Sequence, residues 1–317
     1  MHANLRSSSA LGVSSSALPA AAGAVTKFCS HPSAAAGHEP QYRMHAEFPR
    51  LQLLALEEVL FHEEVGAERV ERLRAQLMQS GLLRNPPIAA PLEHGRFILL
   101  DGATRVTALQ RLGCSALVAQ LVDYPGAGVE LRTWSHFLPQ WKLEEFEERI
   151  CRLGFRLYRC SAAQARHALA NRAFVAAATM DGEQMLALHP PEGLSVASSL
   201  RRLVHAYAGT GNFQRVSEEE IALLRNPAAP LPGVLVVFPP FTPSEIRHLA
   251  LSGERLPAGI TRHLIAGRLL QANIPLAELL SPTSMEEKTQ WLQRWWHERL
   301  RHHRMRYYPE PTFVLEE

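Results

Sequence analysis

One short segment constrains the fold more than any other. Residues 96–100, an arginine followed by four apolar residues, lead directly into Asp101 and Gly102. The run predicts a buried strand, and the spacing of apolar residues over 106–112 predicts a short helix that Gly113 ends. Glycine permits a turn that most side chains would obstruct, and it lets the backbone approach a ligand closely. The segment therefore predicts a strand–turn–helix unit.

The start of that helix is suited to an anion. The free N–H groups of a helix that begins near Ala103 point into the turn, and the helix dipole favours negative charge there. Thr104 offers a hydroxyl, and Arg105 offers a forked cationic donor for phosphate oxygens. Asp101 would hold Mg²⁺ or orient an attacking hydroxyl. From these five residues alone, a plain strand-to-helix turn with Asp101 as the N-cap is the favoured alternative.

The elements around the turn alternate between strand and helix. The order β-α-β-β-α-β, with short strands, is typical of a compact α/β or α+β domain, which here would end near residue 135. The expected strands are 51–56, 88–90, 96–100 and 116–124, and the expected helices are 67–80 and 106–112.

The remaining chain suggests two further units. Residues 1–45 are rich in Ala and Ser and contain one acid, Glu39, so we expect a disordered extension; a transit peptide and a true start at Met44 are alternatives. In the second half, Thr242-Pro243-Ser244-Glu245 predicts a helix start. Other helices are expected at 143–151, 162–178 and 286–304, and a buried strand at 234–238. The division is then 1–45, a nucleotide-binding domain at 46–135, and an α/β substrate-binding domain at 136–317.

Composition argues against several classes of protein. The net charge is +2 with acids and bases interspersed, which argues against a nucleic-acid-binding surface. No run of about 18 apolar residues exists, so we expect no transmembrane helix and no membrane partner. The four cysteines form no CxxC pair, and they indicate reduced, mostly buried thiols of a cytoplasmic protein.

Residues 58–124 resemble the ParB/sulfiredoxin-like nucleotide-binding domain. The likeness rests on His62-Glu63, the segments 84–88 and 100–105, and the pairs Ala108-Leu109 and Leu112-Gly113. It implies that the nucleotide is bound by Gly102, Ala103, Thr104 and Arg105. Many relatives place a histidine immediately before the motif arginine, where this sequence has Thr104.

A longer stretch, residues 53–315, resembles the free L-serine kinases of the ParB-like fold, among them the kinase of staphyloferrin B siderophore clusters. The segments that match in order and spacing are 62–63, 99–105, 133–136, 256–268 and 274–276, with the run 305–307. The resemblance implies an α+β fold in which the C-terminal domain completes the site. It also implies that ATP (with ADP as the alternative donor) and Mg²⁺ convert free L-serine into O-phospho-L-serine for siderophore precursor (2,3-diaminopropionate) synthesis.

The resemblance also implies roles for individual residues. Phosphoryl transfer to an alcohol needs charge neutralisation and a carboxylate that orients the hydroxyl. Glu63 matches the catalytic glutamate of these kinases, and Asp101 would support the metal or the serine. The implied substrate-binding residues are Trp134, Thr261, Arg262 and His263; no metal ligands are assigned. Without the resemblance, Glu63 and Arg262 would be taken as solvated charges and Trp134 as a core residue.

Two other functions stay open at this stage. A ParB-like regulator that binds DNA would need a helix-turn-helix and a basic face, whereas the helical stretch 143–178 begins with four glutamates within residues 144–148. A sulfiredoxin-like reductase would need a reactive cysteine beside the phosphate turn, and Cys114 lies a helix away. The sequence leaves the oligomeric state open.

Overall fold

Two β-sheets and two short ribbons make up the sheet structure of the computed structural model, which describes residues 48–209, 213–224, 232–302 and 304–308. Helices and strands of mixed direction confirm the predicted α+β class. The extension predicted to be disordered, residues 1–45, lies outside the described residues.

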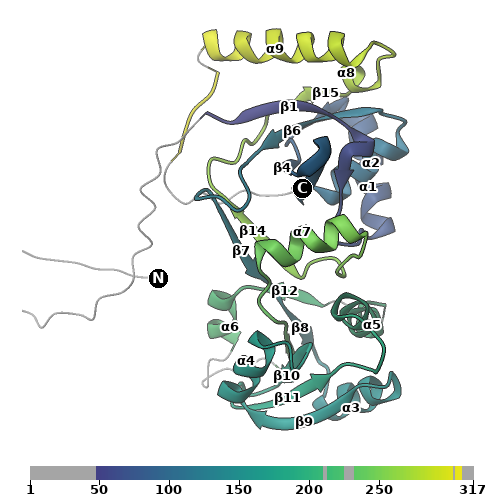
Figure 1. Ribbon diagram of the computed structural model, residues 1–317, viewed down its shortest axis with the longest axis vertical. Coiled ribbons are helices and arrows are strands. Elements are labelled where there is room, and N and C mark those ends of the chain that lie inside the picture. The colour runs from purple at the N-terminus through teal and green to yellow at the C-terminus, as the bar shows by residue number, and fades with distance from the viewer. Residues whose placement is uncertain (1–47, 210–212, 225–231, 303, 309–317) are drawn as a thin grey trace, which may run out of the picture. The chain divides into compact units, whose positions relative to one another are not determined.

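The first sheet contains the predicted phosphate turn (Figure 1). Its strand order is β1 (Arg50–Ala55), β6 (Ala116–Leu121), β4 (Ile88–Pro91), β5 (Phe97–Asp101) and β2 (Val59–Leu60). The pairs β1–β6 and β4–β5 are antiparallel, whereas β4–β6 and β2–β5 are parallel. The helices α1 (Ala67–Ser80) and α2 (Ala103–Arg111) follow β2 and β5, and the 3-10 helices are η1 (Leu56–Glu58) and η2 (Glu93–Gly95).

Side chains of β5 alternate between two hydrophobic cores, as the pleat of a strand requires. Leu99 packs in a core with residues of α1 and α2. Ile98 and Leu100 pack in a second core with residues of the other sheet, such as Leu138. The sheet is therefore covered on both faces. The turn after β5 lies at the carboxyl end of that strand, outside both cores.

The second sheet is antiparallel. Its strand order is β12 (Gln214–Val216), β8 (Ser135–Pro139), β13 (Gly233–Val237), β10 (Ala176–Thr179), β11 (Gln184–His189) and β9 (Arg156–Ser161). The helices of this part are α3 (Leu143–Arg152), α4 (Ala162–Ala170), α5 (Val196–Ala208) and α6 (Glu218–Leu224).

The C-terminal segment returns to the first sheet. A ribbon pairs β7 (Val129–Thr133) with β14 (Thr261–Ile265), and a second pairs β3 (Leu82–Leu83) with β15 (Ile274–Pro275). The helices here are α7 (Pro243–Ser252), α8 (Leu276–Leu280) and α9 (Met285–Arg301); α9 lies along β1 in Figure 1 and buries Trp295 in the core of α1 and α2. The division at residue 135 stays a prediction, and this core contains residues from both sides of it.

Most predicted elements form within a few residues of their expected ends. The capping box at Thr242 and Glu245 is present and starts α7. The predicted helix at 162–178 is wrong in its second half: α4 ends at Ala170, Arg172 has a left-handed φ of 61°, and β10 follows. Ala176–Thr179 pairs with strands on both sides, and these tertiary contacts override the helix propensity of alanine.

The membrane and cysteine predictions have separate outcomes. No helix among the described residues is long and apolar enough to cross a membrane. Cys114, Cys151 and Cys160 are free thiols, but only Cys114 is buried, and Cys151 is exposed.

Candidate active site

Glu63 and Asp101 lie at the same end of the first sheet, where strands β2 and β5 finish. The strands β2 and β5 are parallel neighbours, with Leu60 paired to Ile98, so their carboxyl ends point the same way. Asp101 is the last residue of β5, and Glu63 follows the end of β2. Ligand sites of α/β sheets form outside such carboxyl ends. The two predicted catalytic acids therefore lie where a substrate could reach both.

The Glu63 carboxylate is held by a segment that is distant in sequence. The N–H groups of Ile260 and Thr261 donate to Oε1 at 3.1 and 2.6 Å, and the Thr261 hydroxyl donates to the same oxygen at 2.7 Å. The Gly259 N–H donates to Oε2 at 3.0 Å. A parallel bridge between Glu63 and Leu256 aligns the two segments. Because Oε1 has three donors and Oε2 has one, Oε2 is the oxygen free to accept a further hydrogen bond.

The turn after β5 has the geometry that the sequence predicts. Gly102 has φ 95° and ψ 23°, and a Cβ atom there would lie 3.0 Å from Cβ of Pro87. Gly102 is also the N-cap of α2, without a side-chain cap, so the alternative in which Asp101 caps the helix is wrong. The first backbone bond of the helix runs from Val106 N–H to the Gly102 carbonyl. The N–H groups before Val106 are therefore the ones available to an anion.

Arg105 is directed into the fold as well as toward the turn. Its guanidinium donates to the carbonyl oxygens of Asn85 and Pro86 at 2.7 and 3.0 Å, and to Oδ2 of Asp101 at 2.6 Å. The two carbonyl acceptors tie α2 to the loop before β4, and Asp101 ties it to the end of β5. Phosphate binding by Arg105 stays a prediction, as it does for Thr104.

Arg268 is a second cation at the turn, and it is not among the site residues predicted from the sequence. Its guanidinium donates to Oδ2 of Asp101 at 2.7 Å. The buried Gln120 fixes the loop that carries it, because its amide donates to the Gly267 carbonyl at 3.0 Å and accepts from Leu269 N–H at 2.8 Å. Burial raises the pKa of the Asp101 carboxyl, but the charges of Arg105 and Arg268 outweigh burial and hold this pKa below its usual value.

Two buried histidines lie beside Glu63. The rings of His62 and His263 meet edge to face with centroids 5.4 Å apart. His62 Nε2 lies 2.9 Å from the Thr261 hydroxyl, and since that hydroxyl donates to Glu63, the histidine nitrogen donates to it. Burial is the largest influence on both rings: it lowers the pKa of His62, and it lowers the pKa of His263 to about 3 with a further contribution from His62. Both rings are therefore neutral at pH 7.

The predicted substrate residues divide between the two faces of β14. Thr261 and His263 face His62 and Glu63. Arg262, between them in the strand, lies on the other face, where its guanidinium carbon is 4.3 Å from the ring centroid of Trp134. The structure therefore brings Thr261 and His263 to Glu63 and pairs Arg262 with Trp134 instead.

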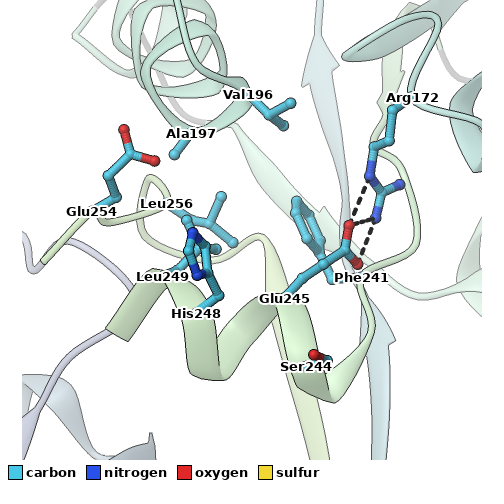
Figure 2. A pocket seen from close by; sticks show the side chains of 10 residues that line it. All are labelled: Arg172, Val196, Ala197, Phe241, Ser244, Glu245, His248, Leu249, Glu254 and Leu256. Carbon is cyan, nitrogen blue, oxygen red and sulfur yellow. Dashed lines mark hydrogen bonds and ion pairs between the residues drawn. The ribbon is translucent and has the colours of Figure 1, made fainter. Parts of the chain in front are cut away.

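A separate pocket of about 510 Å³ lies among residues of α5 and α7 (Figure 2). Its one cation, Arg172, is bound to Glu245 at 2.7 Å, as the dashed lines in Figure 2 show. The other lining residues are Val196, Ala197, Phe241, Ser244, His248, Leu249, Glu254 and Leu256. None of the predicted site residues lines this pocket, and it offers no unpaired Lys or Arg to a phosphate.

The donor set at the turn fits a magnesium ion shared with a nucleotide. Among the described residues, no group of three or more His, Cys, Asp and Glu side chains is placed to hold a metal. Mg²⁺ in kinases is usually held by one or two carboxylates, water and substrate phosphates. Both arginines contact Oδ2 of Asp101, so Oδ1 has no partner within the described part of the chain and could serve as such a ligand.

Comparison with known proteins identifies relatives of this chain. No family model matches the sequence. The ATP-dependent L-serine kinase SbnI of Staphylococcus aureus is 25% identical over 246 residues, which cover 77% of this chain and 89% of that kinase. The chain is a relative of the free serine kinases. An ATP-dependent L-serine kinase of Staphylothermus marinus is 27% identical over 109 residues, 34% of this chain and 43% of that protein.

Solved structures of free serine kinases share the fold. The structure of Staphylococcus aureus SbnI with a C-terminal truncation superposes with a TM-score of 0.63 at 21% identity, covering 79% of this chain and 97% of that one. A free serine kinase in complex with AMP superposes with a TM-score of 0.64 at 19% identity, covering 76% and 98%. The likeness extends across both sheets, since it covers about three quarters of the chain.

Proposed function

We propose that this relative of the free serine kinases transfers the terminal phosphoryl group of ATP to the hydroxyl of free L-serine, giving O-phospho-L-serine and ADP. The observation that carries the proposal is the pair of acids at one sheet edge: Glu63 held by residues 259–261, and Asp101 beside a phosphate-type turn. The sequence likeness to L-serine kinases over 77% of the chain supports the same reaction.

Glu63 is the residue that takes up the hydroxyl proton. Serine would place its hydroxyl against Oε2, the oxygen with one donor, while the three donors to Oε1 keep the carboxylate from rotating. The serine oxygen forms a bond to the γ-phosphorus as the bond from that phosphorus to the β-phosphate oxygen breaks. The proton passes to Glu63, and ADP leaves with the bonding electrons.

The nucleotide phosphates belong at the start of α2. The N–H groups that precede Val106 and the helix dipole favour an anion there, and Gly102 lets it approach the backbone. Arg268, 35% exposed, is the more accessible of the two arginines at Asp101. An arriving phosphate would compete with Asp101 for it.

Asp101 would hold Mg²⁺ through the oxygen that the arginines leave unpaired. The ion supplies neutralisation of the charge that develops on the transferred phosphoryl group. Thr261 and His263 would border the serine, and Trp134 would form a wall of the pocket. Arg262, which the resemblance implies for serine binding, stacks on Trp134. We place the reaction in the cytoplasm, with the product used for siderophore precursor synthesis.

The other two functions lack their structural requirements. The predicted helical stretch 143–178 contains strand β9 between α3 and α4, so these helices do not form a helix-turn-helix. Cys114 is buried, and burial raises the pKa of its thiol, which disfavours the reactive thiolate that a reductase needs.

The test is product formation. Purified protein is incubated with L-serine and Mg²⁺, and with ATP or ADP as donor, and products are identified by mass spectrometry. We expect O-phosphoserine with stoichiometric ADP from ATP. Phosphoserine with AMP from ADP would instead assign the alternative donor. Absence of phosphoserine with both nucleotides would contradict the proposed function.

A further inference from the structure

Arg215 places a guanidinium group directly beside the segment that holds Glu63. It lies on β12, the edge strand of the second sheet, paired with His136 of β8. A Cβ atom built on Gly259 would lie 1.9 Å from Nε and 2.2 Å from Cζ of Arg215. The arginine head group therefore occupies the space that a side chain at position 259 would fill. Since Gly259 N–H donates to Oε2 of Glu63, this cation lies on the side of the oxygen that we assign to the serine hydroxyl.

His136 fixes the backbone at this contact. His136 is fully buried, and its Nε2 lies 3.1 Å from the Gly259 carbonyl while its Nδ1 lies 2.7 Å from the hydroxyl of Tyr207. Gly259 itself has a φ of 86°, which disfavours any residue with a side chain. His136 therefore holds the Gly259 carbonyl while the Arg215 guanidinium lies against the same residue, so the backbone that the guanidinium contacts is fixed.

Arg215 has no hydrogen-bond or ion-pair partner in the part of the chain that the structure describes, although it is only partly exposed. Burial lowers the pKa of its guanidinium, and the charge of Arg69 lowers it further, whereas Glu63 raises it. A guanidinium carries five N–H donors, and a partly buried one is suited to bind an anion such as a carboxylate.

Three other arginines of the site are already engaged. Arg105 binds Asp101 and two carbonyl oxygens, and Arg268 binds Asp101. Arg262, the cation that the sequence suggests for substrate binding, is stacked on Trp134 across the strand from Thr261. Beside the segment that holds Glu63, Arg215 has a guanidinium without a hydrogen-bond or ion-pair partner among the described residues. Arg69, whose charge also reaches Arg215, is exposed, whereas Arg215 is partly buried.

We propose that Arg215 binds the α-carboxylate of the amino-acid substrate and so selects serine over alcohols that lack this group. The inference rests on the proposed function. In serine only the Cα and Cβ atoms separate the carboxylate from the hydroxyl oxygen, so a hydroxyl at Oε2 of Glu63 brings the carboxylate close to Arg215. The planar fork of a guanidinium matches the two oxygens of a carboxylate.

The experiment compares ligands with and without the carboxylate. The KM for L-serine and for ATP is measured in the wild type, Arg215→Gln and Arg215→Lys. Inhibition constants against serine are measured for L-alanine, which keeps the carboxylate, and for ethanolamine, which lacks it. The matched control is Arg156→Ala, which removes an exposed arginine from β9 at the opposite edge of the same sheet. Thermal unfolding of each variant checks that it is folded.

We expect Arg215→Gln to raise the KM for serine and the inhibition constant of alanine by about tenfold or more, the effect of one hydrogen-bonded charge. The inhibition constant of ethanolamine and the KM for ATP should stay at wild-type values, and Arg215→Lys should lie between. If Arg215→Gln raises the inhibition constants of alanine and ethanolamine equally, or raises the KM for ATP, the assignment is overturned. If the wild-type protein does not phosphorylate serine, both the proposed function and this inference fail. The assay of the wild type alone distinguishes that result from a failure of the Arg215 assignment.

Discussion

Thr261 donates both its backbone N–H and its hydroxyl to the same oxygen of Glu63, at 2.6 and 2.7 Å, although the two residues are 198 positions apart. One threonine thereby links the first sheet to the ribbon strand β14. It also receives a hydrogen bond from His62, so the histidine, the threonine and the glutamate form one chain of hydrogen bonds. The orientation of the Glu63 carboxylate depends on this contact.

The Thr261 hydroxyl can be removed at nearly constant shape. In Thr261→Val, Oε1 of Glu63 loses one donor and His62 Nε2 loses its acceptor. We expect kcat with serine to fall by about tenfold, because a buried donor without a partner costs about 1–3 kcal/mol and the carboxylate gains freedom to rotate. Thr261→Ser keeps the hydroxyl and should stay close to the wild-type kcat. Equal rates for the two variants would show that the hydroxyl has no part in positioning Glu63.

The two arginines at Asp101 should respond differently to substitution. Arg105 also binds two backbone carbonyls, so Arg105→Ala should lower the free energy of unfolding by about 2 kcal/mol or more. Arg268 binds only Asp101 among the described residues, so Arg268→Ala should mainly raise the KM for ATP. Denaturant unfolding and steady-state kinetics on both variants measure this. If the KM for ATP is unchanged in both variants, the placement of phosphates at this turn is contradicted.

Gly259 and Gly253 form a matched pair for testing the contact with Arg215. Both have positive φ, 86° and 76°, but a Cβ at Gly253 meets nothing within 4 Å, whereas one at Gly259 would overlap Arg215. Gly253→Ala should therefore cost about 1–2 kcal/mol of stability from backbone strain alone. Gly259→Ala should cost more and also raise the KM for serine, because the guanidinium must move. Calorimetry measures the stability of both variants, and steady-state kinetics measures their KM for serine. Equal stability losses and equal KM values would contradict the close approach of Arg215 to Gly259.

Acid should destabilise the fold through its buried histidines. Burial lowers the pKa of His263 to about 3 and of His136 to about 4, both below the ordinary value of 6.5. Between these values and 6.5 the unfolded state binds more protons than the folded state, so stability is lost as the pH falls. Each such histidine contributes about 1.4 kcal/mol per pH unit in that window. Asp101, whose pKa is also lowered, adds to the loss only near pH 4 and below.

Replacing His263 tests the sign of this effect. The charged or titratable groups that face it are His62, Tyr124, Asp101 and Arg268. The free energy of unfolding is measured by denaturant titration from pH 7 to pH 4.5. We expect His263→Gln to be less stable at pH 7 but to show a shallower decline toward low pH than the wild type. A steeper decline in the variant would contradict a neutral buried His263.

Local sequence signals predict the local parts of the site well. The apolar run before Asp101 and Gly102 correctly places the end of β5 and the start of α2, because turn chemistry and helix spacing act between near neighbours. The capping residues Thr242 and Glu245 place α7 for the same reason. The predicted strand-and-helix class follows from such signals.

Contacts between distant segments are what the sequence does not predict. Nothing near Arg215 or Arg268 in the chain indicates that these side chains lie beside Glu63 and Asp101. The return of the chain after α7 pairs β14 with β7 and carries Arg268 to Asp101. The same return brings residues 259–261 to Glu63 and beside Arg215 of β12. The stacking of Arg262 on Trp134 likewise depends on which face of β14 turns toward Glu63, and a five-residue strand of mixed burial does not reveal this.

The rate of O-phosphoserine formation in Glu63→Gln, compared with Glu64→Gln, tests the central claim most directly. Glu64 is adjacent but contacts Arg201 and His205 instead of residues 259–261, so its substitution controls for charge and local folding. Glu63→Gln should lower kcat by about 100-fold or more, as expected when a general base is removed, while Glu64→Gln should stay near the wild-type rate. Undiminished phosphoserine formation by Glu63→Gln would contradict the assignment of Glu63 as the residue that accepts the serine proton.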